Sequence, residues 1–156
     1  MSLLRELLEL GVNLVNKEVD LKPFFNQYIT EGSRSMMLVI SDSQGQSRFG
    51  LCADKVAFSI KVVEPHTISS PTVEVTVPED LGFYVACGVE TILTSFLKGY
   101  PIEIRGPFSI RDAKLIDKLL SLINEALEKN GKDLCQLLFG KSRSEVIKER
   151  TYGHAS

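Results

Sequence analysis

The chain has 156 residues, of which 44 % are hydrophobic and 24 % charged, and its net charge is −2. This length and balance are typical of one globular domain whose core needs no disulfide or metal to hold it. Basic residues are scattered instead of clustered, which argues against a nucleic-acid-binding protein. No apolar run approaches the roughly 20 residues of a membrane-spanning helix, so no stable membrane insertion is expected.

The first 30 residues are predicted to form an N-terminal helical segment. Apolar residues recur at helical spacing from Leu3 to Val15, and a second, shorter helix is expected over residues 23–29. The polar face of the first helix is acidic, so packing against the rest of the domain is favoured over binding to a membrane surface. Charged residues interrupt the apolar run at the N-terminus, unlike a signal peptide, which predicts a cytoplasmic protein.

Residues 35–129 are predicted to form a core of sheet and helices. Strands are expected at 36–40, 48–52, 56–62 and 72–77, with turns at 42–45 and 54–55 and an irregular loop at 65–71. In the last of these strands Val73, Val75 and Val77 alternate with polar residues. This alternation predicts a sheet with one face toward water, as antiparallel sheets commonly have.

The second half of the chain is predicted to be mainly helical. Pro78 suits the first position of a helix that ends at Gly88, and a second helix is expected from Val89 to Gly99. A short strand at 101–105 precedes a long helix up to residue 129, which Ser109 and Asp112 would start as a capping box. Residues 132–156 are expected to form a C-terminal helical extension, with a frayed tail from residue 151.

The order of these elements carries a family resemblance over residues 36–122. The strand pair with a polar turn is followed by the passage Thr72-Val-Glu-Val-Thr-Val-Pro-Glu-Asp-Leu81 and a helix closed by Gly88. Phe96-Leu97-Lys98-Gly99 then precedes Ile102-Glu103-Ile104-Arg105-Gly106 and a long apolar helix. In this order the sequence resembles the lipid-binding domain of the sterol carrier protein type two family. It departs from that family at Asp54-Lys55, which replaces a glycine-rich turn, and at residues 132–156, which are additional or replace a C-terminal lid.

The resemblance implies an α/β (α+β) fold in which a five-stranded, mainly antiparallel sheet is covered on one face by helices. It also implies a tunnel between sheet and helices for a hydrophobic ligand: a fatty acid, acyl-CoA, sterol or isoprenoid lipid. Twelve positions would form the walls and floor of this tunnel: Phe83, Tyr84, Cys87, Ile92, Phe96, Ile102, Ile104, Ile116, Leu119, Leu120, Ile123 and Leu127. Any α/β domain needs similar residues to fill its core, so a filled core stays open as the alternative.

The sequence presents no convincing catalytic centre, and neither a cofactor nor a metal site is expected. It contains no nucleophile elbow, zinc-protease pair or dinucleotide-binding glycines, and its histidines, His66 and His154, lie in a loop and in the tail. Cys52, Cys87 and Cys135 fit no zinc or disulfide pattern and are expected to be buried small apolar residues. Lys98, Arg105 and Arg111, with Tyr84 and Tyr100, are candidates to meet a polar head group.

Three functions therefore remain open from the sequence. The first is a carrier that binds a hydrophobic small molecule without chemistry. The second is a non-catalytic interaction subunit, which would present its apolar helices or its polar tail to an enzyme partner or to itself as a homodimer. The third is an enzyme that handles acyl-CoA in the same pocket, for which Cys87 and Tyr84 are the candidate groups.

Overall fold

Five strands form one sheet in the computed structural model, which describes residues 2–29, 32–43, 45–107 and 109–153; the candidate His154 lies outside them. The strand order is β3-β2-β1-β4-β5, and only the central pair β1–β4 is parallel. The predicted five-stranded, mainly antiparallel sheet is therefore confirmed. The strands are β1 (Arg34–Asp42), β2 (Gly45–Asp54), β3 (Ser59–Val63), β4 (Val73–Pro78) and β5 (Glu103–Arg105).

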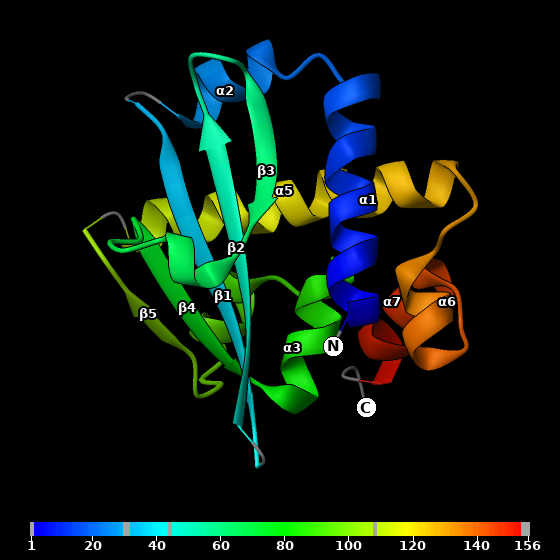
Figure 1. Ribbon diagram of the computed structural model, residues 1–156. Coiled ribbons are helices and arrows are strands. Elements are labelled where there is room, and N and C mark those ends of the chain that lie inside the picture. Colours follow the sequence, from blue (N-terminus) through cyan, green and yellow to red (C-terminus); the bar gives the residue numbers. More distant parts are fainter. Residues whose placement is uncertain (1, 30–31, 44, 108, 154–156) are drawn as a thin grey trace.

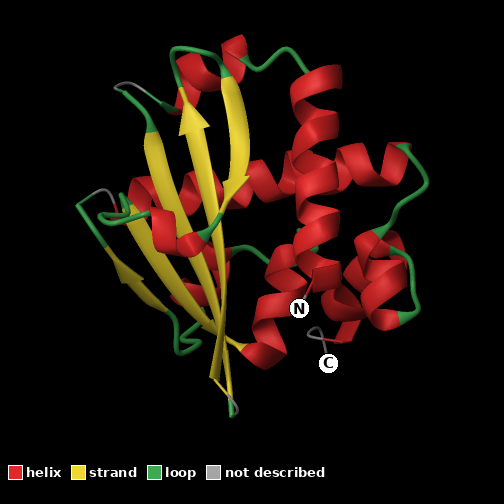
Figure 2. Ribbon diagram, in the orientation of Figure 1, coloured by secondary structure: helices red, strands yellow, loops and turns green. Residues whose placement is uncertain are grey.

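Helices cover one face of this sheet, as predicted (Figures 1 and 2). The long helix α5 crosses behind the strands and contacts β4, α3 contacts β1, and α1 contacts both α5 and β3. Helices α6 and α7 lie to one side of the sheet, where Phe139 and Arg150 contact Tyr84 of α3 (Figure 1). The helices are α1 (Ser2–Glu18), α2 (Lys22–Tyr28), α3 (Glu79–Ala86), α4 (Ile92–Leu97), α5 (Ser109–Lys129), α6 (Leu134–Phe139) and α7 (Arg143–Gly153), and η1 (Pro65–Thr67) is a single 3₁₀ turn.

The sheet face opposite the helices is not simply open to water, in contrast to the prediction. Met37 and Val39 alternate with the core residues of β1 and would be exposed to water if only one face of the sheet were covered. Both are nevertheless buried. Gly50 lies opposite Met37 on β2, and a Cβ atom there would lie 3.0 Å from the Cδ1 atom of Ile68. The loop that contains η1 therefore covers this part of the outer face.

Local hydrogen bonds explain where two predicted elements began too early. The carboxylate of Asp54 accepts hydrogen bonds from the backbone N–H groups of Val56 and Ala57, which makes a turn, so β3 starts at Ser59 and Val56 is exposed. Thr91 caps α4 by accepting a hydrogen bond from the N–H of Thr94, so this helix starts at Ile92 instead of Val89.

The ends of two further helices also differ from the prediction. Pro78 is the extended residue that precedes α3 rather than its first helical residue. Because its backbone is extended, Pro78 can also close β4, and the helix then begins with the carboxylates Glu79 and Asp80. Helix α7 continues to Gly153, past the predicted start of a frayed tail.

A buried ion pair joins the start of β1 to the start of α5. The Nε atom of Arg34 lies 3.4 Å from an oxygen of Asp112, and the two side chains are 4 % and 1 % exposed. Asp112 was predicted as a capping-box residue, but its carboxylate lies in the interior against Arg34; the side chain of Ser109 lies outside the described residues. The pair therefore fixes the long helix to the sheet at a point that local sequence patterns do not reveal.

Helix α1 protects one edge of the sheet. The side-chain amide of Asn16 donates a hydrogen bond to the carbonyl of Ile60 (2.7 Å), and its oxygen accepts one from the N–H of Ile60 (3.0 Å). These bonds satisfy backbone groups of edge strand β3 that could otherwise pair with another chain. The predicted packing of the N-terminal helix against the rest of the domain is thus confirmed.

Candidate functional site

A cleft of about 620 Å³ opens between α3, the segment before β5, and the C-terminal helices. One of its lining residues is Leu81, which is 1 % exposed and belongs to the hydrophobic core. The cleft therefore borders the core between sheet and helices. Its lining consists of Glu79, Asp80, Leu81, Phe83, Tyr84, Tyr100, Phe139 and Arg150.

Aromatic rings and one cation form the wall between α3 and the C-terminal helices. The ring of Tyr84 stacks on that of Phe139, with 4.6 Å between centroids and an angle of 11° between planes. The guanidinium carbon of Arg150 lies 4.0 Å from the centroid of the Tyr84 ring, and its Nε atom is 2.6 Å from Glu90. Burial lowers the pKa of Arg150, but the hydrogen bond and charge of Glu90, together with Tyr84 and Tyr100, raise it by more, so Arg150 stays a cation in the folded protein.

A smaller pocket of about 300 Å³ lies between the end of α3, α4 and α5. In it, one oxygen of Asp117 accepts a hydrogen bond from the N–H of Ile92 (2.7 Å) and the other accepts one from the N–H of Leu93 (3.3 Å). Burial raises the pKa of Asp117 from its ordinary value of 3.8 to about 6, although these hydrogen bonds and Lys118 act in the opposite direction. This carboxylate holds the first turn of α4 on the long helix.

The twelve positions expected to contact a ligand occupy three kinds of place. Phe83 and Tyr84 line the cleft, and Leu120 lines the smaller pocket. Ile104 is half-buried on β5, and Phe96 is 41 % exposed at the surface of α4. The remaining seven are buried in the core between sheet and helices: Cys87, Ile92, Ile102, Ile116, Leu119, Ile123 and Leu127.

No family model and no curated protein matches this sequence. The structure, however, is similar to sterol carrier protein 2 from Yarrowia lipolytica in its apo form, with a TM-score of 0.53 and 12 % sequence identity, over 76 % of this chain and 87 % of that one. It is also similar to a conserved hypothetical protein of Thermus thermophilus whose name relates it to sterol carrier protein, with a TM-score of 0.50 and 14 % identity, over 78 % and 86 % of the two chains. The chain has a sterol carrier protein 2-like fold. The resemblance inferred from the order of the sequence elements is therefore confirmed at the level of the fold.

The cation of the cleft is not among those predicted for this sterol carrier protein 2-like chain. Lys98, Arg105 and Arg111 are exposed and do not line the cleft; Arg105 is paired with its neighbour Glu103. The cation that does line it, Arg150, comes from α7 and is held by a residue 60 positions earlier in the chain. No local sequence pattern links two positions so far apart. The predicted tyrosine Tyr100, in contrast, does line the cleft.

The other candidate groups do not form a catalytic centre in the described residues. His66 is exposed on η1. The nearby Glu64 is paired with Arg5 at 2.7 Å, and this hydrogen bond lowers the pKa of Glu64. Cys87 and Cys135 are buried as predicted, and Cys52 is half-buried. Within the described ranges, no group of three or more His, Cys, Asp or Glu side chains could hold a metal ion. Nor is any helix there long and apolar enough to cross a bilayer.

The raised pKa of Asp117 predicts how stability changes with pH. The folded state holds the carboxyl proton of Asp117 more tightly than the unfolded state does. The contribution of this proton to the free energy of unfolding is therefore fully present below about pH 3.8 and is lost as pH rises through about 6. Replacing Asp117 by Asn removes this dependence. We expect the stability of D117N relative to wild type to improve by about 1–2 kcal/mol between pH 4.5 and 7.5 in urea unfolding series. Parallel stability curves for the two proteins would contradict the assignment.

Proposed function

We propose that this chain binds a hydrophobic ligand, such as a fatty acid, acyl-CoA, sterol or isoprenoid lipid, without catalysing a reaction on it. The observation that carries the proposal is the cleft of about 620 Å³, which is lined by aromatic rings and borders the core at Leu81. Ligand pockets commonly have volumes of about 300–1,000 Å³ with mainly apolar and aromatic walls and a few polar groups. The sterol carrier protein 2-like fold supports this proposal. The proposal also includes the cytoplasmic location that is expected from the sequence.

The apolar part of the ligand is proposed to lie between the sheet and the helices. From the cleft, the chain of the ligand would pass Leu81 and contact the predicted residues of the core on α3, β5 and α5. Each CH₂ group that leaves water contributes about 0.8 kcal/mol, so a long acyl chain needs few specific contacts. Because these side chains already pack together, binding requires α3 and α5 to separate from the sheet as the chain enters.

A polar or acidic head group is proposed to remain in the cleft beside Arg150. The guanidinium already binds a carboxylate, that of Glu90, at 2.6 Å, which supports a carboxylate or phosphate as its partner in the ligand. A ligand carboxylate or phosphate would exchange with Glu90 at this cation. The phenol of Tyr100, on the same cleft, is the proposed second polar contact.

The proposal predicts that truncating the aromatic wall weakens ligand binding. We expect Tyr84→Ala and Phe139→Ala each to weaken the displacement of a fluorescent long-chain fatty acid about tenfold, since each removes one large apolar contact. Leu137→Ala is the matched control, because Leu137 is an exposed residue of the same helix α6 that does not line the cleft. Circular dichroism verifies that each variant is folded.

The same experiment has an outcome that counts against the proposal. Native protein extracted into organic solvent should yield lipid in a stoichiometric amount by mass spectrometry. If no lipid is recovered and the fluorescent fatty acid does not bind wild-type protein, the carrier function is wrong. Equal weakening by Leu137→Ala would instead assign binding to another surface.

An interaction module is the second candidate, and one groove favours it. A groove of about 600 Å³ between α1 and α6 is lined by Leu3, Leu7 and Leu137, and the first and last of these are each 52 % exposed. Light scattering distinguishes this candidate, since a module that pairs with itself through this groove gives a dimer that Leu3→Glu dissociates. An acyl-CoA-handling enzyme is not favoured, because Cys87 is fully buried and its contact with Cys135 and its burial both raise its pKa.

A further inference from the structure

Helices α3 and α6 face each other through two matched pairs of side chains. Tyr84 and Cys87 lie three residues apart at the end of α3, and Cys135 and Phe139 lie four residues apart on α6, so each pair occupies one face of its helix. The rings of Tyr84 and Phe139 stack, and one helical turn away the side chains of Cys87 and Cys135 interact across the same contact between the helices. Both cysteines are 1 % exposed or less.

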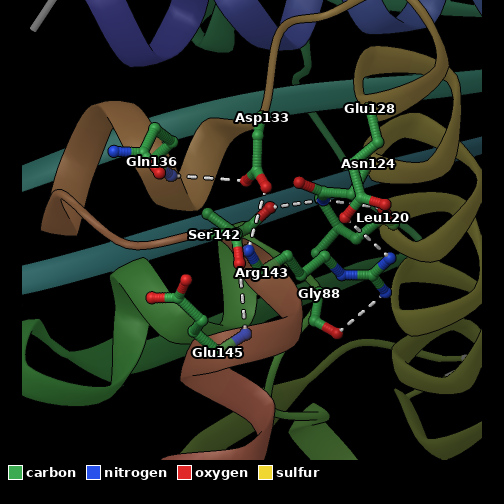
Figure 3. Close-up of polar contacts among 10 residues, drawn as sticks. Gly88, Leu120, Asn124, Glu128, Asp133, Gln136, Ser142, Arg143 and Glu145 are labelled. Atoms are coloured by element: carbon green, nitrogen blue, oxygen red, sulfur yellow. Dashed lines mark hydrogen bonds and ion pairs between the residues drawn. The ribbon is translucent and has the colours of Figure 1, made fainter.

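The surroundings of the two sulfur atoms are unlike those of ordinary core cysteines. Arg143 donates a hydrogen bond to the carbonyl of Gly88, the residue after Cys87, at 3.3 Å and pairs with Glu128 at 3.4 Å (Figure 3). The interaction with Cys87 lowers the pKa of Cys135, and Arg143 acts in the same direction, against burial and the charge of Asp133. The same contact, with burial, raises the pKa of Cys87.

We propose that Cys87 and Cys135 form a reversible intramolecular disulfide that fixes α6 against α3 beside the cleft. The oxidant is a low-molecular-weight disulfide. The thiolate of Cys135 attacks one of its sulfur atoms, which releases the first small thiolate. Cys87 then loses its proton and attacks the sulfur of Cys135, which releases the second. In total, two protein thiols and one small disulfide give one protein disulfide and two small thiols.

Entry of the oxidant requires α6 to move away from α3 for a short time, because both sulfur atoms are buried. Helix α6 is only six residues long, and its N-terminus is held by Asp133, which accepts hydrogen bonds from the N–H groups of Gln136 (3.3 Å) and Arg143 (2.9 Å) (Figure 3). Such a short helix at the end of the fold is a natural unit of local opening. We therefore expect oxidation to be slow.

This disulfide also gives the proposed ligand site a means of regulation, and that consequence rests on the proposed function. Phe139 belongs to the wall of the cleft and moves with α6. In the oxidised protein Phe139 is held on Tyr84, so ligand enters and leaves several-fold more slowly than in the reduced protein. The equilibrium affinity changes less than these rates, because the wall residues themselves are unchanged.

Equilibration of the folded, full-length protein with mixtures of oxidised and reduced glutathione tests the disulfide directly. After alkylation and digestion, mass spectrometry should detect a peptide pair joined through Cys87 and Cys135 in wild type and in C52S, but not in C87S or C135S. Because the bond closes a loop of about 50 residues, the oxidised protein should melt roughly 5–10 °C higher than the reduced protein.

The possible results separate the two proposals. If the linked peptide forms and Tm rises, the disulfide is supported even when the protein binds no fatty acid. In that case only the regulatory consequence fails, together with the carrier function. A linked peptide that forms only in urea, a disulfide through Cys52, or mixed disulfides with glutathione at both positions would overturn the pairing. Ligand release at equal rates from oxidised and reduced protein would overturn the regulation alone.

Discussion

Replacing Asp112 by Ala is expected to lower the free energy of unfolding by about 3–5 kcal/mol, because it leaves the charge of Arg34 buried without its carboxylate. The two side chains are 4 % and 1 % exposed, so the intact pair is shielded from water. Urea unfolding, followed by circular dichroism at neutral pH, measures the loss. Since Asp112 joins α5 to β1, the early turns of the long helix should also exchange their amide hydrogens faster.

Two further variants make this expectation specific. Glu125→Ala removes an exposed carboxylate from the same helix and should change stability by no more than about 0.5 kcal/mol. The double replacement Arg34→Met with Asp112→Leu should recover much of the loss, because an apolar pair avoids the cost of two buried charges. If Asp112→Ala lowers the free energy of unfolding as little as Glu125→Ala does, the ion pair does not stabilise the attachment of α5 to the sheet.

The elements of this fold could largely be predicted from local sequence patterns, because each pattern reflects a local physical cause. Alternating valines gave β4, and the apolar spacing on α1 and α5 gave two helices that pack on the sheet. Where a hydrogen bond to a polar side chain determines the backbone conformation, the sequence pattern predicted the wrong start of the element. Asp54 turns the chain before β3, and Thr91 delays the start of α4. The residues between the predicted and the observed start of each element nevertheless have the periodicity of that element.

The candidate site could be predicted where α3 and the segment before β5, which supplies Tyr100, form it. Phe83 and Tyr84 sit on α3, which leaves the central strands directly, so their place followed from the order of elements. Phe139 and Arg150 reach the same cleft from the C-terminal helices, and their contacts span 55 to 60 positions of the chain. The partner of Asp112 was missed for the same reason, because its spacing from Ser109 matched a local motif and Arg34 is on a distant strand.

The contact between α1 and α5 depends on a glycine that periodicity did not single out. A Cβ atom on Gly11 would lie 2.5 Å from the Cγ2 atom of Ile123 and 3.1 Å from the Cγ atom of Leu127. The absence of a side chain at this position therefore lets the two helices approach closely. Ile123 and Leu127 are also proposed ligand contacts, so this close approach helps to set the space available between the sheet and α5.

Adding a side chain at position 11 is expected to lower the stability of the protein more as the side chain becomes larger. Gly11→Ala should destabilise the protein by about 1–2 kcal/mol, although alanine favours a helix by up to about 1 kcal/mol, because Ile123 cannot give way without disturbing the core. Gly11→Leu should cost about 3 kcal/mol, and Asn13→Leu, at an exposed position of the same helix, should be nearly neutral.

Urea unfolding of these three variants compares the same leucine at a buried and an exposed position of one helix. The comparison largely removes the effect of helix propensity, since leucine is introduced in both variants and glycine and asparagine differ by no more than about 0.5 kcal/mol. A cost at position 11 that equals the cost at position 13 would mean that α1 does not lie against Ile123 in solution. In a folded Gly11→Ala variant, α1 is displaced from α5, so we expect the fluorescent fatty acid to bind with altered affinity if the ligand reaches this part of the core.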